Sequence, residues 1–303
     1  MAKPFLKWAG GKSSSLEAFN NYYPKGIMNG KLDDYIEPFV GGGAVFFDVI
    51  KKANFKNIIL NDLTEELINA YNIIQNHVDE LISTLKLKEK EYLDKDKDGR
   101  KRYYYNTRHL FNKQKLWIKE QSLIESIDFA ANLIFLNRTC FNGLYRLNSK
   151  GEFNVPIGSY TNPTICNSSN LKSVSNALKN VILTSKDFEN SIDILTNSNP
   201  SKTFIYIDPP YRPLPFSQSF KSYSKSDFND SEQERLASWF CKLDKEGYYL
   251  MLSNSDPTEK DPNDTFFEEL YKGYNIKKIK VPRAINSKGT GRNAIPEILV
   301  TNY

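Results

Sequence analysis

The sequence predicts an α/β fold in which a doubly wound parallel sheet is interrupted by a mainly helical insert. Three observations carry this prediction. Short apolar segments alternate with helical patterns over residues 1–85, the segment from 86 to about 137 is charged and helical without strand signals, and the alternation resumes after about residue 175. Strands that alternate with helices are typical of parallel sheets. We therefore expect one discontinuous domain, 1–85 with 165–303, around an insert at 86–164.

The composition is that of an ordinary globular protein. The chain has 303 residues, of which 40% are hydrophobic and 25% charged, so it can bury a core without disulfides or metals. Three scattered cysteines, Cys140, Cys166 and Cys241, predict neither a disulfide framework nor a zinc site and fit a reducing cytoplasm. We find no membrane-spanning run and no signal-peptide pattern. Secreted, fibrous, disordered and membrane classes are therefore excluded.

The net charge of +5 is mild, but its distribution is uneven. Between Lys86 and Lys119 there are twelve basic and five acidic residues, a local charge of +7. Such an excess attracts polyanions by counterion release. A solvated helical surface is the alternative explanation.

The first part of the chain contains two strand–helix pairs. An extended segment at 34–39 runs into the glycine turn Gly41–Gly43, and the apolar run 44–50 continues as a helix. A short buried strand at 57–60 precedes a second helix, with Thr64 as its N-cap. The apolar residues at helical spacing there are Leu67, Ile68, Tyr71 and Ile74.

The predicted insert ends in a helix and a hairpin, after which strands return. Residues 138–158 contain turns and short extended runs that predict a β-hairpin. The helix before them has an apolar face made of Ile127, Ala130, Ala131, Ile134 and Phe135. Buried strands are expected at 180–184, 203–208, 247–253, 275–281 and 297–301.

The sharpest chemical signal is the tetrad Asp208-Pro209-Pro210-Tyr211, directly after the most hydrophobic predicted strand. Ligands of open α/β sheets bind beyond the carboxyl ends of strands, and two prolines fix the backbone there. Such a tetrad can hold an exocyclic amine. Asp208 accepts one hydrogen, the Pro209 carbonyl accepts the other, and Tyr211 stacks on the ring. A rigid turn with Asp208 as a cap is the alternative.

A glycine turn followed by an acidic residue suggests a nucleotide-like cofactor. Phe39-Val40-Gly41-Gly42-Gly43 follows one predicted strand, and Asp62 ends the next, where it can bind ribose hydroxyls. Phe46 stands where a dinucleotide fingerprint has its third glycine. A cofactor with one ribose and no pyrophosphate, such as S-adenosylmethionine, therefore fits better. For this motif alone, an ordinary glycine turn is the alternative.

A second glycine-rich stretch, Lys7-Trp8-Ala9-Gly10-Gly11-Lys12-Ser13, ends like a phosphate-binding loop. The first glycine of that motif would stand at Leu6, and no strand precedes it, so we exclude a phosphate-binding loop. Trp8 and Lys12 can instead clamp a cofactor carboxylate. An N-terminal strap without a ligand is the alternative.

Weaker candidates lie elsewhere in the chain. Asp187 follows a predicted strand, so it either faces the same cleft or caps a helix. Arg138 and Arg146 flank an aromatic and glycine turn in the basic insert and suit base reading, because arginine contacts guanine bidentately. His77 and His109 are isolated and predict no catalytic role. We expect no metal site.

Taken together, these stretches resemble the Dam-type DNA adenine N6-methyltransferases, including those of GATC restriction–modification systems. The order of cofactor motif, recognition insert and tetrad is similar to the alpha arrangement of amino-methyltransferases. An Asp at the first tetrad position is typical of adenine-N6 enzymes. The tail, with Arg283 and Arg292, is also similar. The matching stretches are Lys7–Lys12, Glu37–Gly43, Asn61–Asp62, Arg138–Arg146, Gly151–Pro156, Asp208–Tyr211 and Glu297–Tyr303.

The resemblance implies a Rossmann-like methyltransferase sheet with an inserted DNA-recognition domain that ends in a β-hairpin. Phe141 would wedge near a flipped base, Arg146 would read guanine, and Lys7 would assist at an outer base. The predicted contacts to S-adenosyl-L-methionine include the glycine turn and Asp187. They are Trp8, Lys12, Phe39, Gly41, Gly43, Asp62, Asp187 and Asp208. The predicted DNA contacts are Lys7, Arg138, Phe141, Asn142, Arg146 and Pro156.

We therefore expect an enzyme that transfers a methyl group from S-adenosylmethionine to adenine N6 in double-stranded DNA at 5′-GATC-3′. The base must leave the helix because its amino group is otherwise paired, and transfer is direct and in line. We expect a cytoplasmic monomer of bacterial or phage origin; a cognate restriction endonuclease would share its site without forming a stable complex. Another adenine site, an RNA substrate, or a non-catalytic DNA-binding module are the alternatives.

Overall fold

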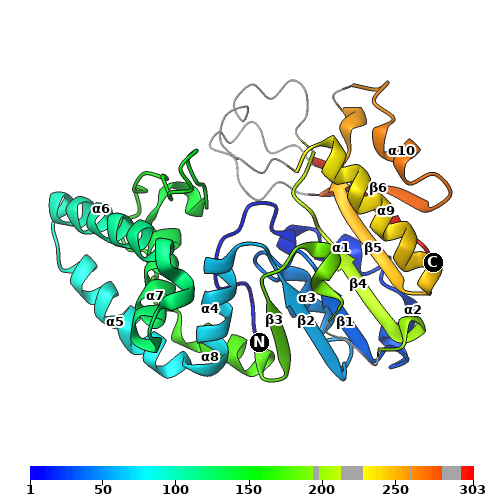
Figure 1. The fold of residues 1–303 in the computed structure, drawn as a ribbon. Helices are drawn as coiled ribbons and strands as arrows, with labels where there is room; N and C mark the ends of the chain where they lie inside the picture. The colour runs from blue at the N-terminus through cyan, green and yellow to red at the C-terminus, as the bar shows by residue number, and fades with distance from the viewer. Residues whose placement is uncertain (194–197, 213–227, 260, 282–294) are drawn as a thin grey trace. The chain divides into compact units, whose positions relative to one another are not determined.

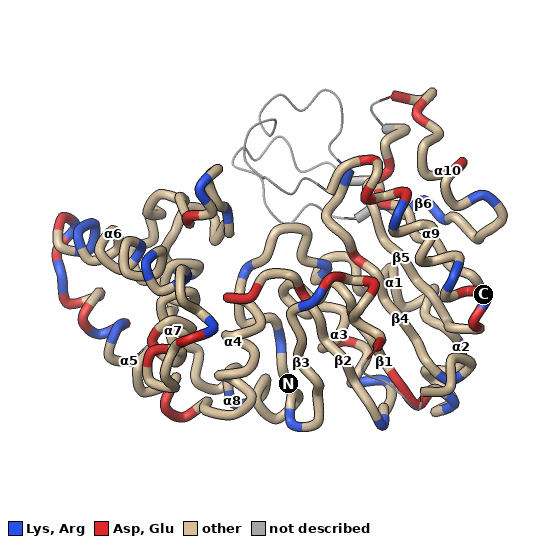
Figure 2. The backbone as a smooth tube through the Cα atoms, viewed as in Figure 1, with Lys and Arg blue, Asp and Glu red and all other residues tan. Residues whose placement is uncertain are grey.

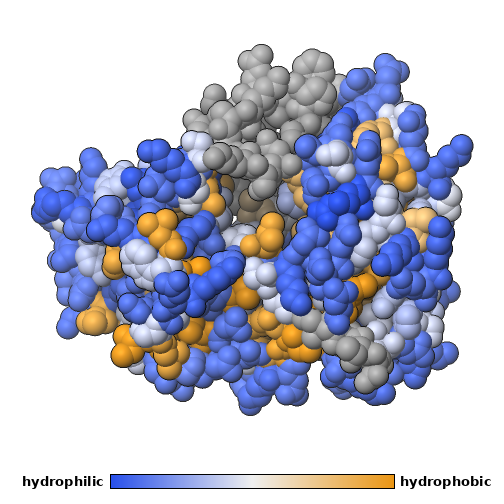
Figure 3. Space-filling model, viewed as in Figure 1, coloured by the Kyte–Doolittle hydropathy of each residue, from blue (hydrophilic) through white to orange (hydrophobic). Residues whose placement is uncertain are grey.

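The structure is a computed structural model (Figure 1). No helix within its described residues is long and apolar enough to cross a bilayer. Hydrophilic side chains cover most of the face that Figure 3 shows, with smaller hydrophobic patches between them. The tail residues Arg283 and Arg292 lie outside the described residues. The residues described are 1–193, 198–212, 228–259, 261–281 and 295–303.

The chain packs as two compact units, each made of several segments. The bounds of these units differ from the domain bounds expected from sequence, which stay a prediction. The first unit comprises Met1–Gly11, Gly41–Gly43 and Asp62–Ser185, and the second comprises Lys12–Val40, Ala44–Asn61 and Lys186–Tyr303.

The second unit is built on a mostly parallel sheet, which confirms the α/β fold class. Its described strands are β1 (Asp34–Glu37), β2 (Asn57–Asn61), β4 (Thr203–Ile207), β5 (Tyr249–Ser255), β6 (Asn275–Val281) and β7 (Ile295–Thr301). They stand in the order β2-β1-β4-β5-β7-β6. β1 pairs in parallel with β2 and β4, and β4 with β5, whereas β7 is antiparallel to both β5 and β6.

The strand order reverses between β1 and β4, and this position determines where the tetrad lies. From β1 the chain first moves to β2 on one side, and later returns to β4 on the other. In open α/β sheets, ligands bind at such a switch point, beyond the carboxyl ends of the strands. Glu37 ends β1, and Asp208 directly follows β4. The two carboxylates therefore lie at the ends of neighbouring strands.

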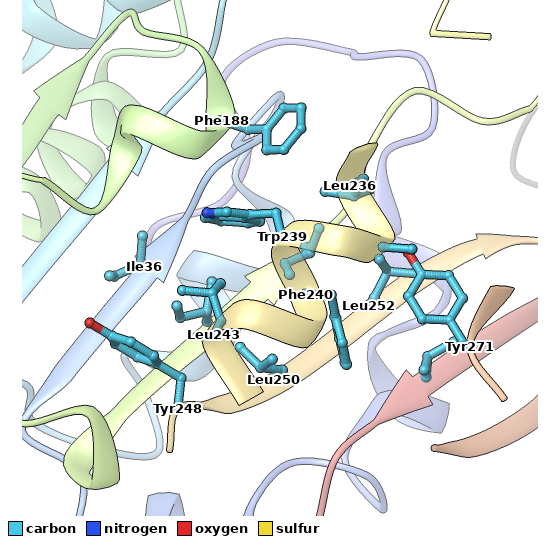
Figure 4. Close-up of a cluster of buried hydrophobic side chains, with 14 of the residues drawn as sticks. Ile36, Phe188, Leu236, Trp239, Phe240, Leu243, Tyr248, Leu250, Leu252 and Tyr271 are labelled. Carbon is cyan, nitrogen blue, oxygen red and sulfur yellow. The ribbon is translucent and has the colours of Figure 1, made fainter. Parts of the chain in front are cut away.

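Helix α9 (Asp230–Glu246) covers this sheet with an apolar face. Figure 4 shows Trp239, Phe240 and Leu243 of α9 packed over Leu250 and Leu252 of β5. The helix begins at an Asn229 cap and ends at a left-handed Gly247, where a side chain would be strained. The other α-helices described in this unit are α1 (Leu16–Phe19), α2 (Lys25–Met28), α3 (Ala44–Val49) and α10 (Phe266–Leu270). The predicted helix at 44–50 is thus confirmed.

The first unit is mainly helical. The apolar face predicted for the helix before the hairpin is buried on α7, which begins at a capping box of Ser122 and Glu125. Thr64 stands at the N-cap of α4 as predicted, but its side chain makes no cap bond, and Asp62 instead accepts a hydrogen bond from its N–H at 2.9 Å. The elements are α4 (Glu65–Asn76), α5 (Val78–Leu93), α6 (Lys97–Gln114), α7 (Leu123–Thr139), α8 (Ser168–Leu178) and β3 (Val181–Thr184).

The predicted hairpin at 138–158 follows an antiparallel path but forms no continuous strands. Only two isolated bridges join its arms, Cys140 with Ile157 and Leu147 with Phe153. The 3₁₀ turn Phe141–Gly143 interrupts one arm between the two bridges, while side chains of α6 bond outward-facing backbone groups of the other arm. Asn112 bonds both the N–H and the carbonyl of Phe153, and the Tyr104 hydroxyl donates to Val155 at 2.8 Å. The segment is therefore a loop anchored on a helix.

Candidate active site

Asp208 is held from two sides in the second unit. The Lys12 ammonium lies 2.9 Å from its Oδ1, and the Ser253 hydroxyl donates to the same oxygen at 2.9 Å. Ser253 lies on β5, beside β4, and its hydroxyl is 2.8 Å from that of Tyr206. Burial raises the pKa of Asp208, while Lys12 and Ser253 lower it. These contacts fix one carboxylate oxygen and keep it an acceptor.

Tyr211 lies beside the same lysine. The Lys12 ammonium is 4.5 Å from the centre of the Tyr211 ring and 3.8 Å from a Glu297 carboxylate oxygen. The Tyr211 hydroxyl and Oε2 of Glu297 are buried without a well-aligned hydrogen-bond partner within the described residues. The two groups are nevertheless close enough to shift each other's pKa, although burial is the largest cause of each shift. Buried polar groups that lack a well-aligned partner are available to a ligand.

A side chain of α9 binds the backbone of the tetrad. Gln233 is fully buried, and its Nε2 donates to the Pro210 carbonyl at 3.1 Å. Asn254 donates to Oε1 of Gln233, also at 3.1 Å. No described residue donates to the Pro209 carbonyl. The Pro210 carbonyl is thus engaged, whereas the predicted acceptor at Pro209 is left for a ligand.

Glu37 is a second buried carboxylate at this edge of the sheet. The Tyr35 hydroxyl donates to it. Burial raises the pKa of Glu37 to about 8, and the negative charge of Asp208 adds to this effect. Glu37 is therefore largely protonated at neutral pH, which lowers the repulsion between the two carboxyl groups.

Asp187 and Phe39 make structural contacts in the second unit. The Asp187 carboxylate caps a short 3₁₀ helix through the Glu189 N–H and is bound by Arg235 at 2.9 Å, which lowers its pKa. Phe39 packs against Phe188, with ring centres 5.5 Å apart. The cap expected as one alternative for Asp187 is present. Cofactor binding by Asp187 and Phe39 stays a prediction.

In the first unit, Trp8, Gly41 and Asp62 lie together. The Gly41 N–H donates to Oδ2 of Asp62 at 3.0 Å, and the Tyr71 hydroxyl donates to the Gly41 carbonyl at 3.1 Å. Gly41 and Gly43 have positive φ angles of 48° and 70°. A Cβ on Gly41 would lie 2.8 Å from the Trp8 ring. Glycine is therefore required at Gly41 by both backbone angle and space.

The loop predicted to contact DNA brings several of its candidates together. The Phe141 N–H donates to the Pro156 carbonyl at 2.9 Å, and Asn142 is left-handed with φ of 56°. The Phe141 side chain is 46% exposed. Lys7 approaches Gly143 so closely that a side chain there would overlap it. This tight turn presents Phe141 to solvent.

The two arginines of this loop have different surroundings. Arg146 is exposed and donates to Oδ1 of Asn154 at 2.7 Å. Arg138 is partly buried and donates to the Phe5 carbonyl at 2.6 Å. The arrangement favours Arg146 as the base reader over Arg138, although both assignments stay predictions.

The basic run is partly neutralised by internal contacts. Lys88, Lys115 and Lys119 form ion pairs with acidic residues of the first unit. Figure 2 shows Lys and Arg recurring along α6. The exposed basic residues that form no ion pair with a described residue are Lys86, Lys90, Lys95, Lys97, Lys101, Arg102 and Lys113. These seven remain available to a polyanion.

Sequence reasoning assigned no role to Ser253, Gln233, Glu297 or Tyr145. Ser253 had a usable signal, because it stands near the carboxyl end of a predicted strand. Gln233 and Glu297 had no usable sequence signal, because their contacts depend on how a helix and an antiparallel strand pack. No group of three or more His, Cys, Asp or Glu residues in the described part of the chain is arranged to hold a metal ion.

Comparison with known proteins adds independent information. The chain matches the family described as D12 class N6 adenine-specific DNA methyltransferase over residues 8–285. It is 47% identical to the Type II methyltransferase M.MjaIII of Methanocaldococcus jannaschii, over 99% of both chains. It is 36% identical to the Type II methyltransferase M1.LlaDCHI of Lactococcus lactis subsp. cremoris, over 99% of this chain and 95% of that protein. It is 32% identical to a DNA adenine methylase of Haemophilus influenzae, over 98% and 92%.

Proposed function

The chain belongs to the D12 class of N6 adenine-specific DNA methyltransferases, and from this premise we propose that it methylates adenine in duplex 5′-GATC-3′. Adenine N6 methylation of DNA is the activity that the family supports. The observation that carries the catalytic proposal is Asp208, fixed by Lys12 and Ser253 beside a Pro209 carbonyl that no described residue engages.

The residues present fit S-adenosylmethionine, which supplies a sulfonium methyl group when bound. In the first unit, the Asp62 carboxylate is half-buried beside a glycine turn that has no room for a side chain at Gly41, and this suits a ribose hydroxyl donor. In the second unit, Tyr211 and Glu297 carry buried polar atoms without aligned partners. We propose Trp8, Gly41, Gly43 and Asp62 as cofactor contacts of the first unit, and Lys12, Phe39, Asp187 and Asp208 as those of the second.

The tetrad would make the adenine amine a better nucleophile. Its lone pair is delocalised into the ring, so the free amine attacks poorly. Asp208 and the Pro209 carbonyl accept its two hydrogens and favour a tetrahedral nitrogen, while Tyr211 stacks on the ring. Positioning of this kind lowers a barrier by roughly 7–11 kcal/mol. A nitrogen held in this way needs no covalent enzyme intermediate.

Recognition would be the task of the loop in the first unit. We propose that the target base is flipped, that Phe141 fills the gap, and that Arg146 reads guanine. Unstacking costs a few kcal/mol, which the stacking of Tyr211 and Phe141 offsets. Lys7, Arg138, Asn142 and Pro156 are proposed as further DNA contacts, and the seven exposed basic residues as phosphate contacts. Two relatives are named Type II methyltransferases, which also favours a role beside a restriction endonuclease.

The test is methyl transfer from labelled S-adenosylmethionine to a duplex with one GATC site, beside a duplex in which that site is scrambled. Nucleoside analysis of the product identifies N6-methyladenine. A third duplex carries 2-aminopurine at the target position, because its fluorescence rises when the base leaves the stack. Asp208→Ala serves as the enzyme control.

Each outcome separates one part of the proposal from the rest. Label on GATC alone supports cofactor, reaction and site together. Label on both duplexes supports the methyl-transfer reaction and overturns GATC as the recognition site. Label on neither duplex, when the cofactor is bound, also overturns GATC as the recognition site. Absence of cofactor binding overturns the enzyme assignment and favours a DNA-binding module. Unchanged 2-aminopurine fluorescence, at a site that is methylated when it carries adenine, overturns base flipping.

A further inference from the structure

Tyr145 occupies an unusual position for a residue of the DNA-recognition loop. It directly precedes Arg146, but its ring turns into the first unit and stacks on Trp8, with ring centres 4.9 Å apart and planes 18° from parallel. Trp8 belongs to the N-terminal stretch proposed to hold the cofactor. The stack therefore joins a proposed cofactor residue to the neighbour of a proposed base reader.

The Trp8 side chain also lies against the glycine turn. A Cβ on Gly41 would lie 2.8 Å from Trp8 Cδ1, and one on Gly42 would lie 3.3 Å from its Cβ. The turn itself is fixed by Asp62 and by the Tyr71 hydroxyl. Trp8 thus has close neighbours in both the cofactor turn and the recognition loop. In such close packing, a shift at one neighbour is transmitted to the other.

The far end of the Tyr145 ring is anchored as well. Its hydroxyl donates to the Glu66 carboxylate, which is buried and also paired with Lys115 at 2.5 Å. Burial and the charge of Glu66 raise the pKa of Tyr145, so the hydroxyl stays protonated as a donor. Glu66 lies in the first turn of α4, which begins just after Asp62. A second connection therefore runs from the ribose-binding candidate to the same tyrosine.

We propose that Tyr145 is a positioning residue that couples cofactor binding to base reading by Arg146. This inference rests on the proposed function. A cofactor that orders Trp8 and the glycine turn also orders Tyr145 and the backbone ahead of Arg146. Subsequent DNA binding then loses less conformational entropy. Coupling between two binding sites is reciprocal, and the cognate duplex must tighten cofactor binding by the same factor.

A purely structural role predicts a different result. Tyr145 also packs on Phe153, at 5.8 Å between ring centres, so its loss lowers stability in either case. A packing residue alone, however, would leave the ratio between the two cofactor affinities unchanged. That ratio is the property that only the coupling role alters.

The experiment measures S-adenosylhomocysteine binding to the full chain by calorimetry, alone and with saturating GATC duplex. The ratio of the two dissociation constants is the coupling factor, expected at about 5-fold or more in the wild type. Tyr145→Leu should bring it close to one. Tyr145→Phe keeps the stack and loses the Glu66 bond, so an intermediate factor is expected. Tyr105→Leu is the matched control, because Tyr105 packs against Arg108 on α6 and should leave the factor unchanged.

The outcomes distinguish this inference from the function on which it rests. If Tyr145→Leu folds and keeps the coupling factor of the wild type, the coupling inference is overturned. If Tyr145→Leu fails to fold, an unchanged coupling factor in Tyr145→Phe overturns it instead. A factor of one in the wild type, with methyl transfer to GATC intact, overturns the coupling and leaves the proposed function standing. No cofactor binding by the wild type overturns the proposed function itself.

Discussion

The Lys12 ammonium lies 2.9 Å from Oδ1 of Asp208, and the lysine side chain is only 3% exposed. A lysine buried this deeply needs a compensating charge, and Asp208 supplies it. Burial raises the pKa of the Asp208 carboxylate, and the contact with Lys12 lowers it. Lys12 therefore acts on the tetrad electrostatically, in addition to the cofactor contact proposed for it.

Asp208→Ala should abolish methyl transfer and leave most DNA binding intact. The variant loses the acceptor that fixes the adenine amine, and loss of one such electrostatic contact typically costs about 100-fold to 1000-fold in kcat. Transfer assays and gel shifts on the GATC duplex measure the two effects. Asp193→Ala, at an exposed acid, is the control. Normal turnover by Asp208→Ala would contradict the catalytic assignment.

Lys12→Met should move the acid limb of the kcat profile to higher pH. Removing the ammonium removes an effect that lowers the Asp208 pKa, so this carboxylate protonates, and activity is lost, at a higher pH than in the wild type. The pH dependence of kcat at saturating cofactor separates this effect from weaker cofactor binding. Lys25→Met, at an exposed lysine, should keep the wild-type profile. An unmoved limb in Lys12→Met would show that Lys12 does not tune Asp208.

Glu37→Gln should flatten the pH dependence of stability. The folded-state pKa of Glu37 is about 8, above the ordinary 4.5, so its contribution is full below about pH 4.5 and is lost as pH rises towards 8. Each pKa unit corresponds to roughly 1.4 kcal/mol. Urea unfolding from pH 5 to 8 measures the slope, which should be smaller in the variant. Equal slopes in both proteins would contradict the raised pKa.

Arg146→Ala should relax discrimination at one base pair by about 1–3 kcal/mol. Arg138→Ala should instead lower stability, because the side chain binds the Phe5 carbonyl. Competition between GATC and singly substituted duplexes measures the first effect, and thermal unfolding the second. If Arg146→Ala discriminates as the wild type does, or if Arg138→Ala loses discrimination instead, the assignment of the base reader is wrong.

Gln233→Met should lower kcat several-fold with little change in the KM for cofactor. It removes the donor to the Pro210 carbonyl, so the tetrad backbone is less well fixed, and a lost buried bond costs about 1–3 kcal/mol of stability. Gln75→Met is a matched control, because Gln75 bonds the Leu178 and Val181 carbonyls in the first unit. Equal kcat losses in both variants would assign Gln233 a general stabilising role only.

Local patterns were enough to predict much of the fold. The strands at 34–37, 57–61 and 203–207 were predictable because short apolar runs ended at turns, and the tetrad was predictable at a sheet edge because strands of a parallel sheet end on the same side. The hairpin was predicted less well. Its strand ladder is interrupted by the turn Phe141–Gly143, and its outer side is held by bonds from Asn112 and Tyr104 of α6, which no local pattern reveals.

The sequence by itself determined the α/β class, the glycine turn, the position of Asp62 at a strand end, and the tetrad. Each depends on residues close together in the chain. Only the tertiary structure decided which partners these residues have. Lys12 reaches Asp208, Gln233 supports Pro210, and Trp8 stacks on Tyr145 across long sequence separations. Such contacts arise from the packing of whole elements, because distant segments become neighbours only when burial of apolar surface brings their helices and strands together.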